Sequence, residues 1–381
     1  MIAVGVSPIG SSEEMKKIVL ITNIPAPYRV DLFAYMQRNL TQYEFHVIYT
    51  SRCEDNRLWN IDESKMKNSH VLESRIIKIK KKLDNRYIHL PGNIGKMLTD
   101  LNPDVVIGFE YNPAALQSFF WCRLHKKPFI HLTDGTLNSE KNFGIVQKLS
   151  RKLIIPRADA SIASSTKAKE KLLAWGAKKE SIFESLLTVD LTPYLEIEKT
   201  YDSHRILYVG SLIPRKGVDL LLDALAYVNV DYELRIVGNG TEEETMNLKK
   251  QAKSLGVESR IIWCGFKTGE DLIEEYRKAA VFVLPTREDC FGLVLLEALA
   301  SGTPIVSSKF ADGAYDIVKD GENGFIVDPK DAKSMGEAID CLLNDKERRK
   351  QFSDHCIPKV GKFSFEEVSK GYERAIEYVE N

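Results

Sequence analysis

Short apolar segments that fit buried strands alternate with segments of helical periodicity along most of the chain. This alternation is typical of βαβ units, in which helices cover a sheet of parallel strands. Because 381 residues exceed one ordinary hydrophobic core, two domains are expected. The predicted fold class is therefore α/β, with two doubly wound Rossmann-like domains. Ligands of such domains bind beyond the carboxyl ends of the strands and in the cleft between domains.

The same pattern predicts the individual elements. In the first half the strands are Ile18–Thr22, Phe45–Tyr49, Val105–Phe109, Phe129–Leu132 and Ala160–Ala163, and the helices are Arg29–Asn39, Pro113–Leu124 and Thr166–Trp175. In the second half the strands are Arg205–Val209, Glu233–Val237, Ile261–Cys264, Val281–Leu284, Pro304–Ser307 and Gly324–Val327. The helices of that half are Gly217–Val228, Glu242–Leu255, Thr268–Ala279, Phe291–Ala300, Ala314–Lys319, Asp331–Asn344 and Phe363–Glu380.

A polar segment containing Pro193 separates the two halves and is the best linker. The expected units are a disordered leader at residues 1–14, a first domain at 15–190, a linker at 191–203, a second domain at 204–362 and a C-terminal helix at 363–381. The leader lacks the basic start of a signal peptide. No apolar stretch approaches the roughly 18 residues that a membrane-spanning helix needs.

Charge is distributed unevenly between the halves. Residues 1–190 hold 28 Lys and Arg against 20 Asp and Glu, whereas the remainder holds 25 against 34. A basic half favours an anionic acceptor or lipid surface, and an acidic half a small ligand, although ordinary variation is an equal alternative. The stretches 75–83 and 148–157 are basic with interleaved apolar residues, so each fits either an anionic membrane or a solvated edge.

Two further classes of property follow from composition and motifs. The six cysteines form no short Cys-x-x-Cys pair, which at this length indicates reduced thiols in a cytosolic protein. No basic stripe with interleaved aromatic residues is present, so no nucleic-acid partner is expected.

Residues 286–302 (TREDCFGLVLLEALASG) concentrate the polar chemistry of the second half. Glu288 and Asp289 follow a buried strand, a helix is expected to open at about Gly292, and Glu297 falls in its second turn. Unpaired N–H groups at a helix start, with carboxylates nearby, suit a ligand that has an anionic end and a hydroxyl-rich end. The alternative is an acidic cap on a core helix.

Residues 210–217 (GSLIPRKG) lie about eighty residues upstream. Arg215 and Lys216 are adjacent cations at a predicted helix start, and together they could hold a diphosphate through charge-assisted hydrogen bonds. A solvated turn is the alternative. Gly238 and Gly240 close the next strand and permit a further close backbone approach.

Together these segments resemble the family-4 retaining glycosyltransferases, which have the GT-B fold, two Rossmann-like domains facing a central cleft. The resemblance is dense in the second half, where it runs from Gly210 through residues 263–266 (WCGF) to residues 321–327 (GENGFIV). In the first half it rests on residues 24–29 (IPAPYR) alone.

The resemblance implies a nucleotide-sugar donor site in the second domain and an acceptor site in the first. Lys216 and Asp289 would serve catalysis. The donor-binding residues would be Gly210, Arg215, Lys216, Gly238, Phe266, Lys267, Glu288, Asp289, Phe291, Gly292, Leu293 and Glu297.

Individual roles follow from the same resemblance. Lys216 would contact the diphosphate, and the backbone of residues 291–293 the phosphates or the sugar. An acid of the Glu288-Asp289 pair would contact sugar hydroxyls, and Glu297 the ribose. Residues around Phe266 and Lys267 would flank the nucleobase.

The chain departs from the family pattern at four places. Asp289 stands where the family usually has Glu, and Ser211 stands where it often has Arg. A loop with Pro25 and Pro27 replaces the usual glycine pair after the first strand. Asp134 lies near the position of a His in many relatives.

Asp134 follows a predicted strand of the first half and is the candidate there for catalysis or acceptor positioning, with a helix-cap role as the alternative. Tyr28 and Arg29 are candidate acceptor-binding residues, with packing at a helix start as the alternative. Glu110 and Glu140 are weaker candidates of the same kind.

The implied function is a retaining hexosyltransferase that moves a sugar from a nucleotide sugar, taken as UDP-linked, to a hydroxyl of a glycan or lipid-linked acceptor. No cofactor and no metal are expected, because no Asp-x-Asp motif occurs and Lys216 and Arg215 could stabilise the leaving diphosphate. The expected location is cytoplasmic, with peripheral contact to the inner face of a membrane as an option. The alternatives are a nucleotide-sugar 2-epimerase and a non-catalytic nucleotide-sugar-binding protein.

Overall fold

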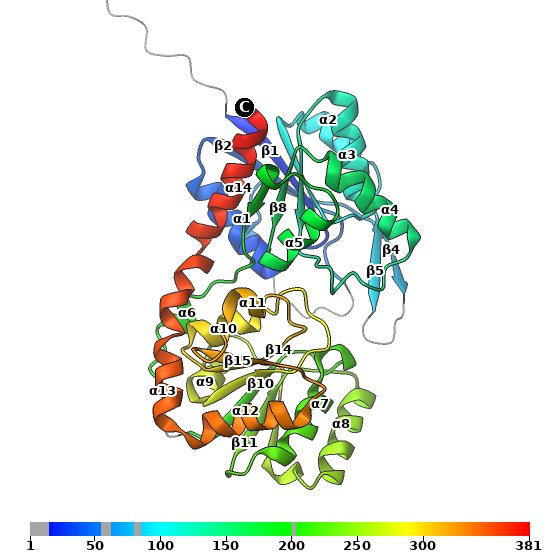
Figure 1. Cartoon of the computed structure of the whole chain (residues 1–381). Helices are drawn as coiled ribbons and strands as arrows, with labels where there is room; N and C mark the ends of the chain where they lie inside the picture. The colour runs from blue at the N-terminus through cyan, green and yellow to red at the C-terminus, as the bar shows by residue number, and fades with distance from the viewer. Residues whose placement is uncertain (1–14, 55–61, 80–84, 200–202) are drawn as a thin grey trace, which may run out of the picture.

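The structure, a computed structural model, describes residues 15–54, 62–79, 85–199 and 203–381. Two α/β domains lie one above the other and touch along one side of each (Figure 1). The doubly wound α/β class predicted from the sequence is confirmed. The predicted leader at residues 1–14 and the last residues of the basic stretch 75–83 lie outside the described residues.

The first domain is built on a parallel sheet of seven strands, flanked by helices. In spatial order the strands are β3 (Ser69–Val71), β2 (Tyr43–Tyr49), β1 (Lys16–Thr22), β6 (Val105–Phe109), β7 (Phe129–Thr133), β8 (Ala160–Ala163) and β9 (Ile182–Glu184). The helices are α1 (Pro27–Asn39), α2 (Ile94–Leu101), α3 (Pro113–His125), α4 (Ile145–Ile154) and α5 (Thr166–Ala174). The central strands are buried along most of their length, because helices cover both faces of the sheet.

The second domain has a parallel sheet of six strands. In spatial order these are β12 (Ile261–Gly265), β11 (Glu233–Val237), β10 (Arg205–Val209), β13 (Val281–Leu284), β14 (Ile305–Ser308) and β15 (Gly324–Val327). Its helices are α7 (Val218–Ala224), α8 (Glu242–Ser254), α9 (Gly269–Lys278), α10 (Val294–Ala300), α11 (Ala314–Ile317), α12 (Ala332–Asn344) and α13 (Lys346–Asp354).

Strand order determines where a ligand can bind. In the second sheet the order reverses between β10 and β13, which are neighbours although they are distant in sequence. The first sheet reverses in the same way between β1 and β6. The loops that leave the carboxyl ends of such a strand pair diverge to opposite faces and leave a crevice. Each domain therefore offers one binding crevice, at the end of the sheet that its switch point defines.

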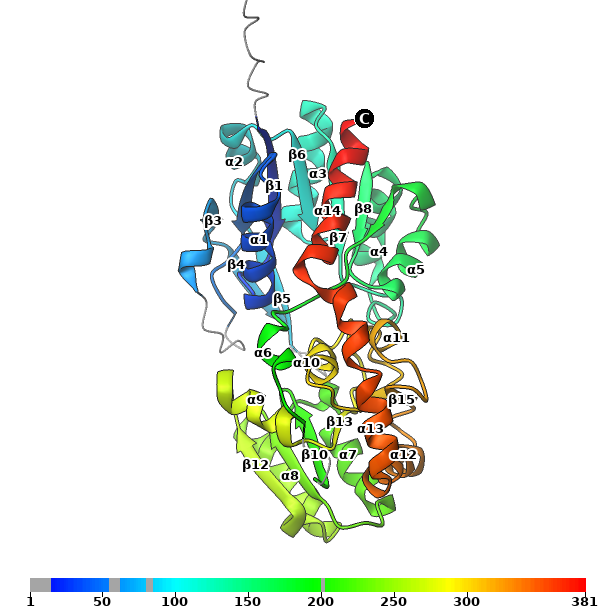
Figure 2. The same cartoon turned by 90° about the vertical axis from the view of Figure 1, so that its left-hand side faces the viewer.

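The last helix, α14 (Phe365–Glu380), joins the two domains. It packs against β8 and β9 of the first sheet, while α13 lies on the second domain (Figure 2). Ser185 Oγ donates a hydrogen bond of 2.7 Å to the carbonyl of Val368 in this helix. The chain thus crosses between the domains twice, once at the short helix α6 (Thr192–Leu195) within the predicted linker and once before α14. The domain boundaries themselves stay predictions.

Sequence reasoning missed several elements of the first domain. An antiparallel hairpin of β4 (Arg75–Ile79) and β5 (Arg86–Leu90) occupies much of the first basic stretch. The second basic stretch forms α4, of which Arg151 is buried. Helix α2 was also missed. The two strands of the hairpin are too short for a clear periodic signal, whereas α2 and α4 do carry an amphipathic helical pattern that the prediction overlooked.

The helix that follows Asp289 begins later than predicted. The structure begins α10 at Val294, because Gly292 has φ +83°, which lies outside the helical region. Residues 291–293 are therefore a turn before the helix. Glu297 accordingly belongs to the first helical turn and not to the second.

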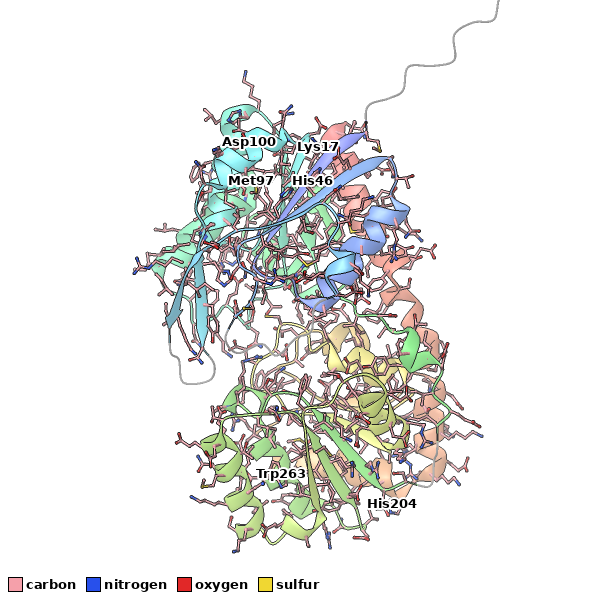
Figure 3. All side chains as sticks on the ribbon, turned by 180° about the vertical axis from the view of Figure 1, so that it is seen from behind. Lys17, His46, Met97, Asp100, His204 and Trp263 are labelled. Atoms are coloured by element: carbon pink, nitrogen blue, oxygen red, sulfur yellow. The ribbon has the colours of Figure 1, made fainter. Side chains whose placement is uncertain are left out.

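Side chains are present throughout both domains, and of the labelled residues Lys17, His46, Met97 and Asp100 belong to the first domain and His204 and Trp263 to the second (Figure 3). None of the six cysteines forms a disulfide. No helix in the described ranges is both long and apolar enough to cross a membrane.

The contact between α14 and the first sheet can be tested at Gly371. A Cβ atom at this position would lie 2.3 Å from the carbonyl oxygen of Glu184 and 2.7 Å from Cβ of Ser185. We predict that Gly371→Ala lowers the free energy of unfolding by about 1–3 kcal/mol, as overpacking of a close contact does. Chemical denaturation measures the change.

Gly361→Ala is the matched control, because no atom lies within 4 Å of the Cβ it would add. Equal stability of the two variants would contradict the close packing of α14 on β9.

Candidate active site

Two loops of the second domain meet at its switch point and bring together charges of opposite sign. Lys216 follows β10, and Asp289 follows β13, 73 residues later. Lys216 Nζ donates a 2.6 Å hydrogen bond to Asp289 Oδ2. Arg215 lies 3.9 Å from the same carboxylate oxygen. The two predicted catalytic residues of this domain are therefore in direct contact.

The loop that carries Lys216 is fixed by backbone contacts with the loop after β13. The backbone N–H of Arg287 and the hydroxyl of Thr286 both donate to the carbonyl of Arg215, at 2.8 and 3.0 Å. Gly217 has φ +71°, and a Cβ atom there would lie 2.2 Å from the carbonyl oxygen of Pro285. Only glycine permits this approach, which explains its place directly after the two cations.

Asp289 is a partly buried carboxylate that its neighbours hold charged. Burial opposes ionisation, but Lys216 and Arg215, with the Phe291 N–H group, hold the pKa of Asp289 below its ordinary value. That N–H group donates to Asp289 Oδ1 at 3.3 Å. Contacts from the two loops thus fix the positions of both carboxylate oxygens.

A third loop, which follows β14, fixes the backbone of Asp289. The N–H group of Asp289 donates to the carbonyl of Phe310 at 3.0 Å, and the N–H group of Asp312 donates to the carbonyl of Asp289 at 2.9 Å. This short parallel bridge explains how a residue in a loop can hold its carboxylate in one position.

The turn at residues 291–293 offers backbone and not side chains to a ligand. Phe291 is 2% exposed, and its ring belongs to the core of the second domain. Gly292 adopts φ +83°, where a Cβ atom would lie 2.9 Å from Cδ2 of Leu284. The predicted backbone role of Phe291, Gly292 and Leu293 stays a prediction.

Glu297 lies on the inner side of α10 and accepts a 2.8 Å hydrogen bond from the hydroxyl of Tyr276. Tyr194 of α6 also donates to this carboxylate. Burial nevertheless outweighs both hydrogen bonds and raises the pKa of Glu297 to about 7. The predicted ribose ligand is therefore engaged by two tyrosines, one of which comes from the segment between the domains.

The remaining predicted donor residues differ in whether they are available to a ligand. Phe266 is 50% exposed just beyond β12, so its ring is open to a ligand. Lys267 Nζ instead donates to Glu275 Oε1 at 2.5 Å. The close approach predicted at Gly238 is made to the protein itself, because a Cβ atom there would lie 1.8 Å from the carbonyl oxygen of Gly210.

The carboxyl group of Glu288 ionises less readily than that of Asp289. Burial, together with Asp312 and Asp289, raises the pKa of Glu288, while Lys141 and Arg215 act in the opposite sense. Its carbonyl accepts a hydrogen bond of 3.0 Å from Arg215. Of the two adjacent acids, Asp289 is the one that Lys216 binds.

In the first domain Arg29, in the first turn of α1 after β1, reaches Asp134, which follows β7, the strand next to the switch-point strand β6. Arg29 Nη2 donates a 2.6 Å hydrogen bond to Asp134 Oδ2, and its guanidinium lies 4.2 Å from the ring centre of Phe109. Although burial opposes the charge, Asp134 and nearby tyrosines raise the pKa of Arg29. Arg29 therefore positions Asp134, and a role in acceptor binding stays a prediction.

Asp134 keeps one oxygen for a further partner. Its Oδ1 atom is buried, and no described group donates a hydrogen bond to it. Tyr28, Arg29, Asp134 and Tyr372 line a small cavity at this position. Because an unpaired buried carboxylate oxygen is costly, the site is suited to a ligand hydroxyl.

Glu110, one of the weaker sequence candidates, fixes the backbone of the loop that contains Asp134. Its Oε1 atom accepts hydrogen bonds from the backbone N–H groups of Asp134 and Gly135, at 2.7 and 3.1 Å. Its backbone has φ +58°, an unusual conformation for a residue with a side chain. Glu110 is thus a positioning residue, which aims its carboxylate at the loop backbone.

A second layer of buried charge lies behind this loop. Lys171 Nζ donates to Thr133 Oγ1 at 2.7 Å and to Glu140 Oε1 at 3.0 Å. Arg151 Nε donates to Glu140 Oε2 at 2.5 Å. Arg151 and Lys171 hold the pKa of Glu140 below its usual range although burial opposes ionisation. Glu140 therefore contributes to the framework of the loop.

Contacts between the domains connect the two half-sites. Thr136 Oγ1, two residues beyond Asp134, donates to Asp312 Oδ2. The thiol of Cys290, next to Asp289, forms a hydrogen bond with Ser139 of the first domain, and burial raises the pKa of this thiol to about 12. The loop that follows Asp134 therefore contacts the loops of Asp289 and Asp312.

Sequence reasoning missed Asp312, Thr136, Lys171 and Arg151. Each is a common residue type with no motif around it, and each acquires its partner only through the packing of distant loops. The described ranges contain no cluster of three or more His, Cys, Asp or Glu residues able to hold a metal ion.

Residues 196–356 match the family model for glycosyl transferases group 1. Over 213 residues the chain is 32% identical to an uncharacterized glycosyltransferase of Haemophilus influenzae, a match that covers 55% of this chain and 59% of that protein. It is also 32% identical to the lipopolysaccharide core biosynthesis glycosyltransferase LpsE of Rhizobium meliloti, over 46% of this chain and 51% of that protein. The chain thus spans about half to three fifths of the length of these relatives.

Solved structures show the same fold over nearly the whole chain. Anabaena Alr3699/HepE in complex with UDP superposes with a TM-score of 0.77 at 18% identity, covering 95% of this chain and 100% of that one. The lipopolysaccharide outer core galactosyltransferase WaaB in its apo form gives 0.73 at 19% identity, covering 95% and 99%. The predicted GT-B fold is confirmed, and most of the residues that match the family model for glycosyl transferases group 1 lie in the second domain.

The protonation of Glu297 leads to a testable dependence of stability on pH. A carboxyl group whose pKa is near 7 in the folded state and ordinary in the unfolded state stabilises the fold fully below the unfolded pKa. That contribution is lost as pH rises toward the folded pKa. We predict that the wild type loses on the order of 2 kcal/mol more than Glu297→Gln between pH 4.5 and 7, since one pKa unit corresponds to about 1.4 kcal/mol.

Denaturation curves at a series of pH values measure this difference. Glu322→Gln is the control, because Lys319 lowers the pKa of that exposed carboxyl group. Parallel pH profiles for wild type and Glu297→Gln would contradict the raised pKa.

Proposed function

We propose that the chain is a retaining glycosyltransferase of family 4 that transfers a sugar from a nucleotide sugar to a hydroxyl of a saccharide acceptor. One observation carries the proposal: the Lys216–Asp289 ion pair lies at the switch point of the second domain, and the loop of the first domain that carries the Arg29–Asp134 pair contacts the second domain beside Asp289. The group 1 match over residues 196–356 supports it.

In the proposed mechanism the two cations after β10 receive the diphosphate. Departure of a nucleoside diphosphate leaves negative charge on phosphate oxygens, and fixed positive charges stabilise that change without reorganisation. Lys216 and Arg215 are fixed by the loop after β13, so their charges are already in position. Lys216 would share its ammonium protons between Asp289 and the phosphate.

The two carboxylates would hold the sugar between the domains. Asp289 is ionised and accepts hydrogen bonds, which suits donor-sugar hydroxyls. Asp134 Oδ1 has a free acceptor position that a hydroxyl of the sugar or the acceptor could fill. Because Asp289 is one methylene shorter than Glu, we assign sugar preference to this position.

The proposed chemistry needs no protein nucleophile. The acceptor oxygen attacks the anomeric carbon on the face from which the diphosphate leaves, so the new glycosidic bond forms as the bond to phosphate breaks. The acceptor proton passes to the departing phosphate oxygen. Configuration at the anomeric carbon is thereby retained, and we propose that the step requires no metal ion.

Names of related proteins support the choice of substrates. Anabaena Alr3699/HepE has been solved in complex with UDP and glucose, which favours a UDP-linked donor here. The LpsE relative acts in lipopolysaccharide core biosynthesis, which favours a growing, lipid-linked saccharide as the acceptor. We propose a cytoplasmic location for the enzyme, where nucleotide sugars are available.

Lys216→Ala tests the proposal, because this cation makes the contact assigned to the leaving group. We predict a loss of roughly 10²–10³-fold in turnover, the size seen when one transition-state stabiliser is removed. Release of UDP from a UDP-sugar in the presence of an oligosaccharide acceptor is the measurement.

Lys319→Ala is the matched control, since Lys319 is an exposed cation of the same domain that pairs with Glu322. Near-wild-type turnover in Lys216→Ala would contradict the assignment. Conversion of the donor without an acceptor would indicate a 2-epimerase instead. Binding of the donor without turnover on any acceptor would indicate a non-catalytic protein.

A further inference from the structure

Helices α3 and α4 of the first domain expose an unusual amount of apolar surface. They contact each other along one edge of the domain (Figure 1). In α4, Ile145 and Val146 are each 77% exposed, and Leu149 is exposed as well. In α3, Leu124 is 79% exposed, and Phe120 is also exposed. We call these five side chains, with the cations beside them, the α3–α4 face.

The charge around these apolar residues has one sign. Residues 141–158, which contain α4, hold five Lys and Arg residues and no Asp or Glu. Lys148 and Lys152 are exposed on α4, and within the described part of the chain neither forms an ion pair. They lie on the same side of the helix as Ile145 and Leu149, at spacings of three and four residues.

Helix α3 adds cations whose positive charge is partly neutralised by nearby acidic residues. It contains no acid between Pro113 and Lys127. Arg123 donates to Asp159 at 3.2 and 3.3 Å, and Lys127 lies 3.6 Å from Asp104. Lys126 is exposed at the end of the helix. The face as a whole keeps a positive charge.

The hairpin β4–β5 extends the same surface. Strand β5 contacts α3, and every residue of β4 is exposed. This strand combines Ile76, Ile77 and Ile79 with the cations Arg75 and Lys78. The hairpin therefore repeats the combination of apolar and basic side chains on a neighbouring element.

We propose that the α3–α4 face docks on an anionic lipid bilayer. Exposed aliphatic and aromatic side chains can enter the boundary between headgroups and acyl chains, while lysines beside them remain at the level of the anionic headgroups. An amphipathic helix without acidic residues fits such a surface, because its cations attract the anionic headgroups and its apolar side chains reach the boundary with the acyl chains. A protein partner would have to supply a matching acidic and apolar groove.

The inner side of α4 connects this face with the active-site loop. Arg151 is 3% exposed and binds Glu140, which in turn binds Lys171, and Lys171 binds Thr133 next to Asp134. A bilayer under α4 would therefore lie at a fixed position relative to Asp134. If the proposed function holds, a lipid-linked acceptor would approach from this side.

Vesicle flotation of the full chain tests the docking without any assay of activity. We expect the protein to float with vesicles of phosphatidylcholine and phosphatidylglycerol, and to remain unbound with phosphatidylcholine alone. Lys148→Gln with Lys152→Gln should weaken binding roughly thirtyfold, because each lysine near an anionic surface contributes about fivefold. Ile145→Ser with Leu149→Ser should weaken it at least as much, at unchanged charge.

The control variant combines Met246→Ser with Lys250→Gln on α8, which removes exposed residues of the same kinds from the second domain. It should bind as the wild type does. All of these positions are exposed, so circular dichroism should show the same folded state in every variant.

Three results would overturn the proposal. The first is equal flotation with neutral and anionic vesicles, and the second is unchanged binding by both α4 variants. The third is a dimer in light scattering that Ile145→Ser with Leu149→Ser dissolves, because the face would then join two copies of this chain. Loss of turnover in Lys216→Ala with vesicle binding intact would separate this inference from the proposed function.

Discussion

The ion pair between Lys216 and Asp289 depends on the strand order of the second sheet. β10 and β13 become neighbours only because the order reverses there, and this reversal places the loops after them side by side. Gly217 lets the first loop approach Pro285, and the bridge to Phe310 and Asp312 holds the second. A small change in either loop would separate the cation from the carboxylate. The chemistry of the second domain thus rests on topology as much as on residue type.

In the first domain the position of the acidic residue, Asp134, is fixed by more buried charges than in the second. Asp134 is held by Arg29, its loop backbone is held by Glu110, and the loop is supported by Lys171 and Glu140. Isolated charges at such depth would be strongly destabilising, but each of these groups has a partner of opposite sign or a backbone donor. Breaking one partner should cost more than the pair contributes. The framework therefore favours a rigid position for Asp134.

Sequence patterns predicted the second domain well because its strands are continuous apolar runs and its motifs are local. All six of its predicted strands lie within one residue of the observed bounds at each end, and the sequence assigned Lys216 and Asp289, which are in contact, to one site. The start of α10 was misplaced because the conformation of Gly292 cannot be inferred from its neighbours. Asp312 and Thr136 were missed because their contact joins two loops 176 residues apart. The exposure of α4 was also hidden, since the sequence shows an amphipathic segment without showing which side is buried.

The most direct test of the proposed donor site compares the binding of UDP and UMP by isothermal titration calorimetry. If Lys216 and Arg215 hold the diphosphate, the wild type should bind UDP more tightly than UMP by roughly tenfold to a hundredfold, the value of one or two charge-assisted hydrogen bonds. Lys216→Ala should lose most of that difference while its affinity for UMP changes little. An equal preference for UDP in the wild type and in Lys216→Ala would contradict the assignment of the diphosphate to this pair of loops.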